Sequence, residues 1–151
     1  ADKQVSLKTN IPSDLPVIAI DPTRMTQVLL NLLGNALQYT PPGGHVTVHC
    51  SVISNQLPVK DEYYLPNTEH RLLITVTDTG IGLTADQLAH IFERFYRVDK
   101  SRSRAGGGSG IGLTISKQLV EAHKGRLTAA SPGLNQGSTF TVTLPLSETI
   151  A

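Results

Sequence analysis

The amino-acid sequence predicts a single α/β domain, and three observations support this fold class. The chain has 151 residues, which is enough for one substantial hydrophobic core and too few for two. Residues 21–39 carry apolar side chains at helical spacing. Shorter segments alternate apolar and polar residues or are rich in β-branched residues, as strands are. These segments are residues 4–9, 45–53, 71–77, 126–130 and 138–144.

Two strands are expected before the long helix. Residues 4–9 alternate apolar and polar side chains, and residues 10–14 have the composition of a turn. Residues 17–20 are a short apolar run, which we interpret as a second strand that leads directly into Asp21.

The long helix has clear start and stop signals and two distinct faces. Asp21 is a favourable N-cap and Pro22 fits the first turn, whereas the prolines and glycines of residues 41–44 cannot continue a helix. One face is apolar and the other is polar without any acidic residue. The apolar face comprises Met25, Val28, Leu29, Leu32, Leu33, Ala36 and Leu37, and the polar face comprises Arg24, Gln27, Asn31, Asn35 and Gln38.

Asn31 and Asn35 stand one helical turn apart on the polar face. Asn is a mediocre residue for a helix interior because its side chain competes for backbone hydrogen bonds. Two amide oxygens side by side suit a hard cation such as Mg²⁺, which takes oxygen ligands and shares them with phosphates. The alternative, which the helix alone leaves open, is a polar face packed under a loop.

The middle of the chain predicts a strand, a long loop and a second strand. We interpret Cys50, in the first strand, as a buried inert thiol, and His45 and His49 as solvated strand residues rather than a metal pair. Residues 54–70 have no period and predict a long hairpin loop, and residues 71–77 are apolar and β-branched, as central strands are.

A sharp glycine turn follows that central strand, from Asp78 to Leu83. Thr84 and Gln87 fit a capping box, so a short helix is expected through Ala89. Residues 91–96 are interpreted as a second short helical piece.

The C-terminal part predicts a mobile segment, a helix and a final strand pair. Residues 98–109 are polar and rich in Ser, Arg and Gly, and residues 111–123 form an amphipathic helix that Gly125 ends. His123 is interpreted as a helix-end residue rather than a catalytic one. Residues 132–137 form the turn between the last two strands.

The glycine run of residues 106–112 opens directly into that helix. Such a junction offers free backbone N–H groups and the positive end of the helix dipole, and therefore attracts phosphate. The run matches neither a P-loop nor a dinucleotide fingerprint, and a plain flexible linker is the alternative.

Composition excludes several functional classes. The net charge of +1 gives no basic footprint for nucleic acid, and a single cysteine excludes an internal disulfide or a Cys-rich zinc site. The sequence has no apolar run of membrane-spanning length and no signal-peptide layout. Because the chain starts at Ala1 without Met, we expect an excised piece of a longer protein. The sequence as a whole fits a reducing, cytoplasmic environment.

Asp78 has three possible roles. A carboxylate at the mouth of a buried strand could accept a hydrogen bond from an exocyclic amine such as that of adenine, or could cap an Asx turn. Asp-Thr-Gly is also the active-site triplet of aspartic proteases, which need two such aspartates. With one triplet, a protease would have to be a homodimer, and the paired asparagines and the glycine run would be unexplained.

Four motifs in order and spacing resemble the N, G1, F and G2 boxes of the ATP-binding catalytic domain of sensor histidine kinases. They are Asn31 to Pro41, Asp78 to Leu83, Ile91 to Asp99 and Gly108 to Leu113. The stretch from Gly137 to Pro145 is similar to the closing strand of that family, so the resemblance covers nearly the whole chain. It implies that residues 1–151 form one domain.

The resemblance implies a Bergerat-type two-layer α/β sandwich, with a mixed, mostly antiparallel sheet covered by helices on one face. It implies ATP and Mg²⁺ as ligands, with Asn35 the principal metal ligand and Asn31 supporting the metal and the phosphates. Tyr39 would flank the adenine and Asp78 would bind its amino group. The remaining implied nucleotide-binding residues are Gln38, Gly80, Gly82, Arg97, Gly108, Gly110, Gly112, Leu113 and Thr139.

The same resemblance implies a moving lid, about residues 98–109, with Phe92 and Phe95 anchoring one end in apolar surface. Arg97 would reach the terminal phosphates and, with Asn31, serve catalysis. Related kinases commonly carry Lys or Arg where Gln38 stands; Arg102 or Arg104 could compensate from the lid. Hydrolytic relatives carry Glu at the position of Asn31, and Asn cannot act as a base, which fits transfer to a protein rather than to water.

The function implied is therefore transfer of the γ-phosphoryl group of Mg·ATP to a histidine on a separate helical dimerisation domain, in two-component signalling with a response regulator receiver domain. That dimerisation domain is absent from this chain, which is expected to be monomeric and to bind ATP without autophosphorylation. A degenerate module that binds nucleotide without transferring it is the alternative.

Overall fold

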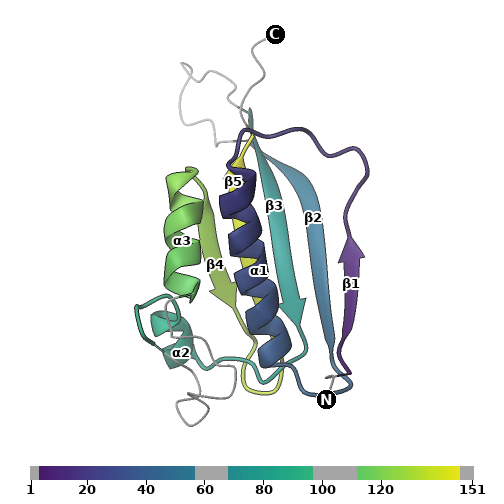
Figure 1. The fold of residues 1–151 in the computed structure, drawn as a ribbon, viewed down its shortest axis with the longest axis vertical. Coiled ribbons are helices and arrows are strands. Elements are labelled where there is room, and N and C mark those ends of the chain that lie inside the picture. Colours follow the sequence, from purple (N-terminus) through teal and green to yellow (C-terminus); the bar gives the residue numbers. More distant parts are fainter. Residues whose placement is uncertain (1–3, 57–67, 97–111, 147–151) are drawn as a thin grey trace.

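The computed structural model describes residues 4–56, 68–96 and 112–146. A five-stranded sheet forms one layer and the helices lie on one of its faces (Figure 1). The strands are β1 (Ser6–Asn10), β2 (His45–Gln56), β3 (Thr68–Asp78), β4 (Arg126–Ala130) and β5 (Ser138–Pro145). The helices are α1 (Pro22–Gln38), α2 (Ala85–His90) and α3 (Gly112–Ala122). The predicted α/β fold class is confirmed.

The sheet is mixed and mostly antiparallel, in the order β1-β2-β3-β5-β4. Only β1 and β2 pair in parallel; the other three pairs in the described sheet are antiparallel. Within the β3–β5 pair, Asp78 lies opposite Ser138. The last residue of β3 and the first residue of β5 therefore meet at the same end of the sheet.

Helix α1 begins and ends where the sequence predicts. The Asp21 carboxylate accepts hydrogen bonds from the backbone N–H groups of Thr23 and Arg24, at 3.0 and 3.2 Å, and Pro22 occupies the first turn. The inner face of the helix is buried at Met25, Val28, Leu32 and Ala36. Burial of such side chains stabilises the fold by about 1.5–3 kcal/mol each for the larger ones.

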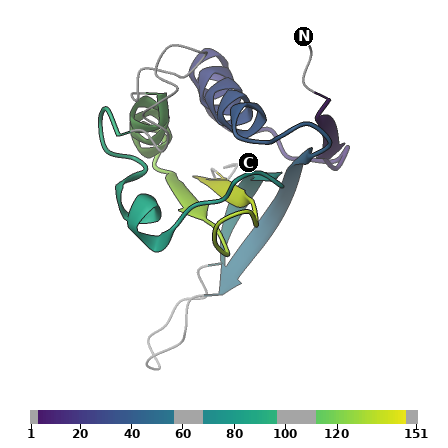
Figure 2. The ribbon, with the colours of Figure 1, turned by 90° about the horizontal axis from the view of Figure 1, so that it is seen from below.

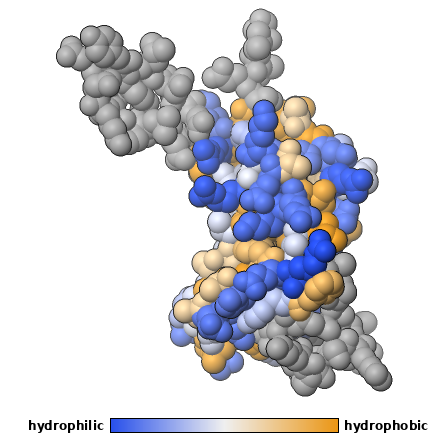
Figure 3. Space-filling model, turned by 90° about the vertical axis from the view of Figure 1, so that its left-hand side faces the viewer, coloured by the Kyte–Doolittle hydropathy of each residue, from blue (hydrophilic) through white to orange (hydrophobic). Residues whose placement is uncertain are grey.

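Helices α1 and α3 lie side by side on the covered face of the sheet (Figure 2). The hydrophobic core lies between these helices and the inward residues of the strands, among them Val76, Phe140 and Cys50. Cys50 is buried, as predicted, and burial raises the pKa of its thiol. On the side that carries α3, hydrophilic residues cover much of the described surface, with apolar areas between them (Figure 3).

His123 joins the end of α3 to the start of α1. Its Nδ1 lies 2.7 Å from the Leu119 carbonyl oxygen, and its Nε2 accepts a hydrogen bond of 3.1 Å from the backbone N–H of Asp21. A carbonyl oxygen can only accept, so Nδ1 carries a proton in this contact, while Nε2 accepts from the Asp21 N–H. His123 therefore has the helix-end position expected from the sequence.

Three local predictions differ from the structure. Residues 17–20 form no strand; Ile18 and Ile20 pack against the core from an irregular segment, in which Val17 is 99% exposed. Packing on the core accounts for the apolar character of Ile18 and Ile20 without a strand, so the predicted strand is wrong. The loop expected over residues 54–70 is shorter, because β2 and β3 continue their pairing as far as Gln56 and Thr68.

The second helical piece expected over residues 91–96 is a series of turns. Backbone hydrogen bonds run from Glu93 N–H to the His90 carbonyl and from Tyr96 N–H to the Glu93 carbonyl. Phe95 has a φ of 66°, which a right-handed helix cannot include. The preceding helix α2 is confirmed, with the full capping box between Thr84 and Gln87. Among the described residues, no helix is long and apolar enough to cross a membrane.

Candidate functional site

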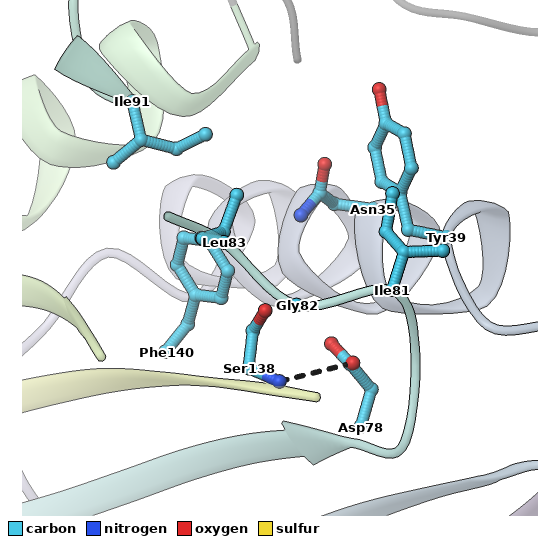
Figure 4. Close-up of a pocket in the computed structure, with 9 residues that line it drawn as sticks. All are labelled: Asn35, Tyr39, Asp78, Ile81, Gly82, Leu83, Ile91, Ser138 and Phe140. Atoms are coloured by element: carbon cyan, nitrogen blue, oxygen red, sulfur yellow. Dashed lines mark hydrogen bonds between the residues drawn. The ribbon is translucent and has the colours of Figure 1, made fainter. Parts of the chain in front are cut away.

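A pocket that is partly open to solvent lies between the C-terminal half of α1 and the ends of β3 and β5, where Asp78 meets Ser138. It has polar groups from both sides and an apolar wall (Figure 4). The residues that line it are Asn35, Tyr39, Asp78, Ile81, Gly82, Leu83, Ile91, Ser138 and Phe140.

Asp78 is the buried charged group of this pocket, with 6% of its surface exposed. Its Oδ1 atom accepts hydrogen bonds from the backbone N–H groups of Gly80, at 2.8 Å, and Ser138, at 3.2 Å. Burial raises the pKa of the carboxyl above its ordinary value, and the two backbone hydrogen bonds oppose that shift. The carboxylate thus has one oxygen fixed by the fold and the other available for a ligand.

The turn after Asp78 passes very close to the end of α1. The Ile81 N–H donates to the Tyr39 carbonyl at 3.1 Å, and a Cβ atom on Gly80 would lie 2.3 Å from the same oxygen. Only glycine fits at position 80 without moving the backbone. This approach sets the width of the pocket between Asp78 and Tyr39.

The turn between β4 and β5 holds the other side of this loop. Asn135 N–H donates to the Ile81 carbonyl at 2.7 Å, and Gly137 N–H donates to the Gly80 carbonyl at 3.1 Å. The Ser131 hydroxyl accepts from Leu83 N–H at 3.0 Å and donates to the Gly137 carbonyl at 2.6 Å. The turn from Asp78 to Leu83, here called the pocket loop, is therefore fixed by residues about 50 positions later in the chain.

Asn35 and Tyr39 extend from α1 on the opposite side of the pocket loop from Asp78 (Figure 4). Both side chains are half-buried. The next residue, Thr40, is fully buried, and its hydroxyl donates to the Ala36 carbonyl at 2.6 Å, which fixes the end of the helix. The helix end therefore presents an amide and a phenol ring to the pocket from a rigid support.

Asn31 lies one turn earlier and faces α3. Its Nδ2 atom donates to the Ser116 hydroxyl at 3.1 Å and lies 3.4 Å from the Gly112 carbonyl oxygen. The sequence left open whether Asn31 and Asn35 bind a cation or only pack. Asn31 does pack, but through its nitrogen, so its oxygen is the atom that it can turn to a ligand.

Phe92 connects α3 to the pocket wall. Its ring meets the ring of Phe140 edge-on, with centroids 6.2 Å apart, and the Lys117 ammonium lies 5.1 Å above it. Thr114 donates to the Phe92 carbonyl at 2.8 Å. Phe92 is thus anchored in apolar surface as expected, whereas Phe95 is 66% exposed and is not.

Other predicted nucleotide-binding residues have mixed positions. Thr139 points away from the pocket, because its neighbours Ser138 and Phe140 line it, and its hydroxyl pairs with that of Thr77 at 3.2 Å. Thr139 therefore does not line this pocket, although the sequence predicts it as a nucleotide-binding residue. Gln38 is half-buried but does not line the pocket, and Leu113 packs against the core. Arg97, Gly108, Gly110 and the expected lid, together with Arg102 and Arg104, lie outside the described residues.

Several residues of the site are not predicted from the sequence, among them Ser131, Gly137, Ser138 and Phe140. Gly137 has a φ of 76°, and a Cβ atom there would lie 2.0 Å from the Asp78 carbonyl oxygen. The composition of residues 132–137 predicts a turn, but only the pairing of β3 with β5 shows that this turn lies next to Asp78. Within the described residues, no three His, Cys, Asp or Glu side chains come together as a metal site.

Comparisons with known proteins agree with this geometry. The family described as histidine kinase-, DNA gyrase B- and HSP90-like ATPase matches residues 20–148. The adaptive-response sensory kinase SasA of Synechococcus elongatus is 42% identical over 144 residues, which is 95% of this chain and 33% of that protein. The sensor histidine kinase WalK of Bacillus subtilis is 41% identical over 148 residues, 97% of this chain and 22% of that protein. The chain thus spans a third or less of these relatives.

Solved structures show the same fold. The mycobacterial sensor histidine kinase MprB has a TM-score of 0.72 and 26% identity, covering 95% of this chain and 83% of the other. Full-length ShkA in complex with AMPPNP has a TM-score of 0.71 and 30% identity, covering 97% of this chain and 27% of the other. The chain therefore belongs to the histidine kinase-, DNA gyrase B- and HSP90-like ATPase family, as a domain of the kind found in sensor histidine kinases.

Proposed function

We propose that this domain binds Mg·ATP in the pocket between α1 and the Asp78 turn and provides the γ-phosphoryl group for transfer to a histidine on a separate dimerisation domain. The observation that carries this proposal is the buried Asp78 carboxylate, fixed by two backbone donors and facing Asn35 and Tyr39 across the pocket. AMPPNP, which ShkA binds, is an analogue of ATP, and this supports an adenine nucleotide as the ligand. Membership of an ATPase family argues against the homodimeric aspartic protease.

The base would be recognised by the free oxygen of Asp78. Because Oδ1 already accepts from Gly80 and Ser138, Oδ2 is the atom that can accept from the exocyclic amine of adenine. Ile91 and Phe140 supply apolar surface for the ring, and Tyr39 would flank it from α1. A base without an exocyclic amine at that position would leave the carboxylate without its partner, which favours adenine over guanine.

The phosphates would lie toward the two asparagines. Asn35 and Asn31 offer amide oxygens one turn apart, and such hard oxygen donors suit Mg²⁺ that is shared with phosphates. When bound, Mg²⁺ supplies neutralisation of the phosphate charge. Asn31 cannot take a proton from water, so the domain would hold ATP for transfer rather than hydrolyse it. Arg97, Gly108, Gly110 and Gly112 are proposed to complete the phosphate site.

The remaining parts of the reaction would come from other domains. The phosphoacceptor histidine and the dimerisation helices are proposed to belong to the same full-length protein, and the receiver domain to a response regulator, in the cytoplasm. On this proposal the isolated domain is monomeric and binds ATP but does not phosphorylate itself.

Calorimetric titration with AMPPNP, with and without Mg²⁺, tests the nucleotide site. Asn35→Ala should weaken binding at least tenfold in Mg²⁺ and much less in EDTA, because it removes a metal ligand (roughly tenfold or more for such losses). Gln27→Ala is the matched control, since Gln27 is an exposed amide on the same helix, away from the pocket. Wild-type protein that binds no nucleotide, or equal losses in both variants, would refute the site.

A second experiment tests phosphoryl transfer. Labelled ATP should give no acid-labile phosphohistidine on this domain alone, but should give it on an added dimerisation domain. Label on the isolated domain would contradict the proposal. Nucleotide binding without transfer to any added acceptor would favour the degenerate, regulatory module instead.

A further inference from the structure

Ser116 is a fully buried hydroxyl on the inner face of α3, with 0% of its surface exposed. Its Oγ accepts the hydrogen bond from Asn31 Nδ2 at 3.1 Å, across the interface between the two helices that Figure 2 shows side by side. The second acceptor near the same nitrogen is the Gly112 carbonyl oxygen, at 3.4 Å. The Asn31 amide nitrogen therefore lies between two groups of α3.

These two contacts define which way the Asn31 amide faces. A carbonyl oxygen can only accept, so the atom near Gly112 must be the amide nitrogen and not the oxygen. The contact with Gly112 is long for an N–H···O bond, and the contact with Ser116 is the shorter of the two. Ser116 is thus the stronger of the two restraints that turn Oδ1 away from α3.

We propose that Ser116 is a positioning residue for the metal–phosphate site: it holds the Asn31 nitrogen so that the oxygen of Asn31 faces the ligand. This inference rests on the proposed function. A partner in the outer shell that fixes a ligand's orientation is typically required for full metal affinity. Without the Ser116 hydroxyl, the amide can turn by 180° and present its NH₂ group, which cannot bind a cation.

A purely structural role for Ser116 makes a different prediction. The Ser116–Asn31 bond also ties α1 to α3, and its loss could weaken binding by letting the helices separate. His123 makes a second tie between the same helices, through its bond to Asp21 N–H at the far end of α1. His123→Phe removes that tie while keeping a ring in place, and it does not touch Asn31.

The test is the factor by which Mg²⁺ lowers the Kd for AMPPNP, measured by calorimetry in EDTA and in excess Mg²⁺. Ser116→Ala should reduce this factor by about tenfold while leaving the Kd in EDTA within about twofold, and His123→Phe should leave the factor unchanged. Ser116→Cys keeps most of the volume with a weak acceptor and should also reduce the factor. Ser116→Cys replaces Ser116→Ala in this test if the alanine variant folds poorly.

Side-chain amide resonances provide a readout without nucleotide. The two Nδ2 protons of Asn31 should shift in Ser116→Ala and not in His123→Phe. An unchanged Mg²⁺ factor in Ser116→Ala, or an equal loss in His123→Phe, would overturn the positioning role while leaving nucleotide binding intact. A wild-type protein whose affinity ignores Mg²⁺ would instead overturn the metal site itself, and the inference with it.

Discussion

Gly82 and Gly133 approach each other so closely that a Cβ atom on Gly82 would lie 2.0 Å from the Gly133 carbonyl oxygen. Gly82 also has a φ of 71°, a conformation that other residues rarely adopt. The pocket loop and the β4–β5 turn therefore meet through backbone at this point. Position 82 therefore requires glycine, because any side chain there would push the two segments apart.

Gly82→Ala is expected to destabilise the domain. The left-handed backbone alone costs about 1–3 kcal/mol for a residue with a Cβ atom, and the contact with Gly133 adds to that cost. Denaturant unfolding measures the change. Gly112→Ala is the control, because the nearest neighbours of its new Cβ lie at 3.9 Å and beyond; a loss as large in the control would show that the Gly133 contact is not the cause.

Gly34→Ala should have the opposite effect. Gly34 lies inside α1 with open space around the position of a Cβ atom. Replacing glycine by alanine in a helix interior typically stabilises by about 0.5–1 kcal/mol. Thermal and denaturant unfolding should both show the gain, and a decrease in stability would mean that α1 needs glycine for a reason absent from its described contacts.

Asp78→Asn should stabilise the domain at neutral pH and not at low pH. Burial raises the pKa of Asp78, so the folded state prefers the protonated carboxyl. The contribution of Asp78 is therefore favourable below the unfolded pKa, about 3.8, and is lost as pH rises through the higher folded pKa. Asparagine does not titrate and keeps an oxygen for both backbone donors. Denaturant unfolding between about pH 3 and pH 8 measures this. The unfolding free energies of wild type and Asp78→Asn should diverge as pH rises.

Asp78→Asn should also bind ATP more weakly than wild type. An asparagine can turn its NH₂ group toward the base, where the exocyclic amine of adenine also donates. We therefore expect higher stability and weaker AMPPNP binding in one protein, a combination that a merely structural aspartate would not give. Unchanged binding would remove Asp78 from the base site.

His90 should titrate above its ordinary range. A hydrogen bond and the negative charge of Glu93, 2.6 Å away, raise the pKa of His90, and Asp86 adds to this. The stabilising contact is thus present below the unfolded pKa and disappears as pH rises past the folded one. Proton NMR of the imidazole should show the shift in wild type and its reversal in Glu93→Gln. Asp86→Asn, at a longer distance of 3.9 Å, should change it less.

The sequence predicted the elements that carry strong local signals. Helix α1 was placed within one residue because Asp21 and Pro22 start it and residues 41–44 end it. The strands with a regular two-residue alternation of apolar and polar residues were also predicted, because that alternation is itself a local signal. Residues 17–20 were misread because an apolar run can pack on a core without joining a sheet, and nothing local distinguishes these outcomes.

The candidate site was predictable only in part. Asn35, Tyr39 and Asp78 lie in motifs that indicate chemistry, and the structure brings them to one pocket. Ser131 contacts a loop about 50 residues earlier through its hydroxyl, and Gly137 contacts it through its backbone N–H; no local pattern reveals these contacts. Thr139 lies in the closing-strand motif but points away from the pocket that Ser138 and Phe140 line, because the side of a strand that a residue faces changes with every position.

The donors to Asp78 are main-chain N–H groups, and this affects how the proposed recognition of adenine could persist through evolution. Every amino acid except proline supplies such a group, so position 138 can accept many small substitutions without loss of the anchor. A mutational scan should find proline strongly selected against at this position and alanine or threonine accepted. Sequences could therefore diverge around the aspartate and keep the proposed specificity for adenine.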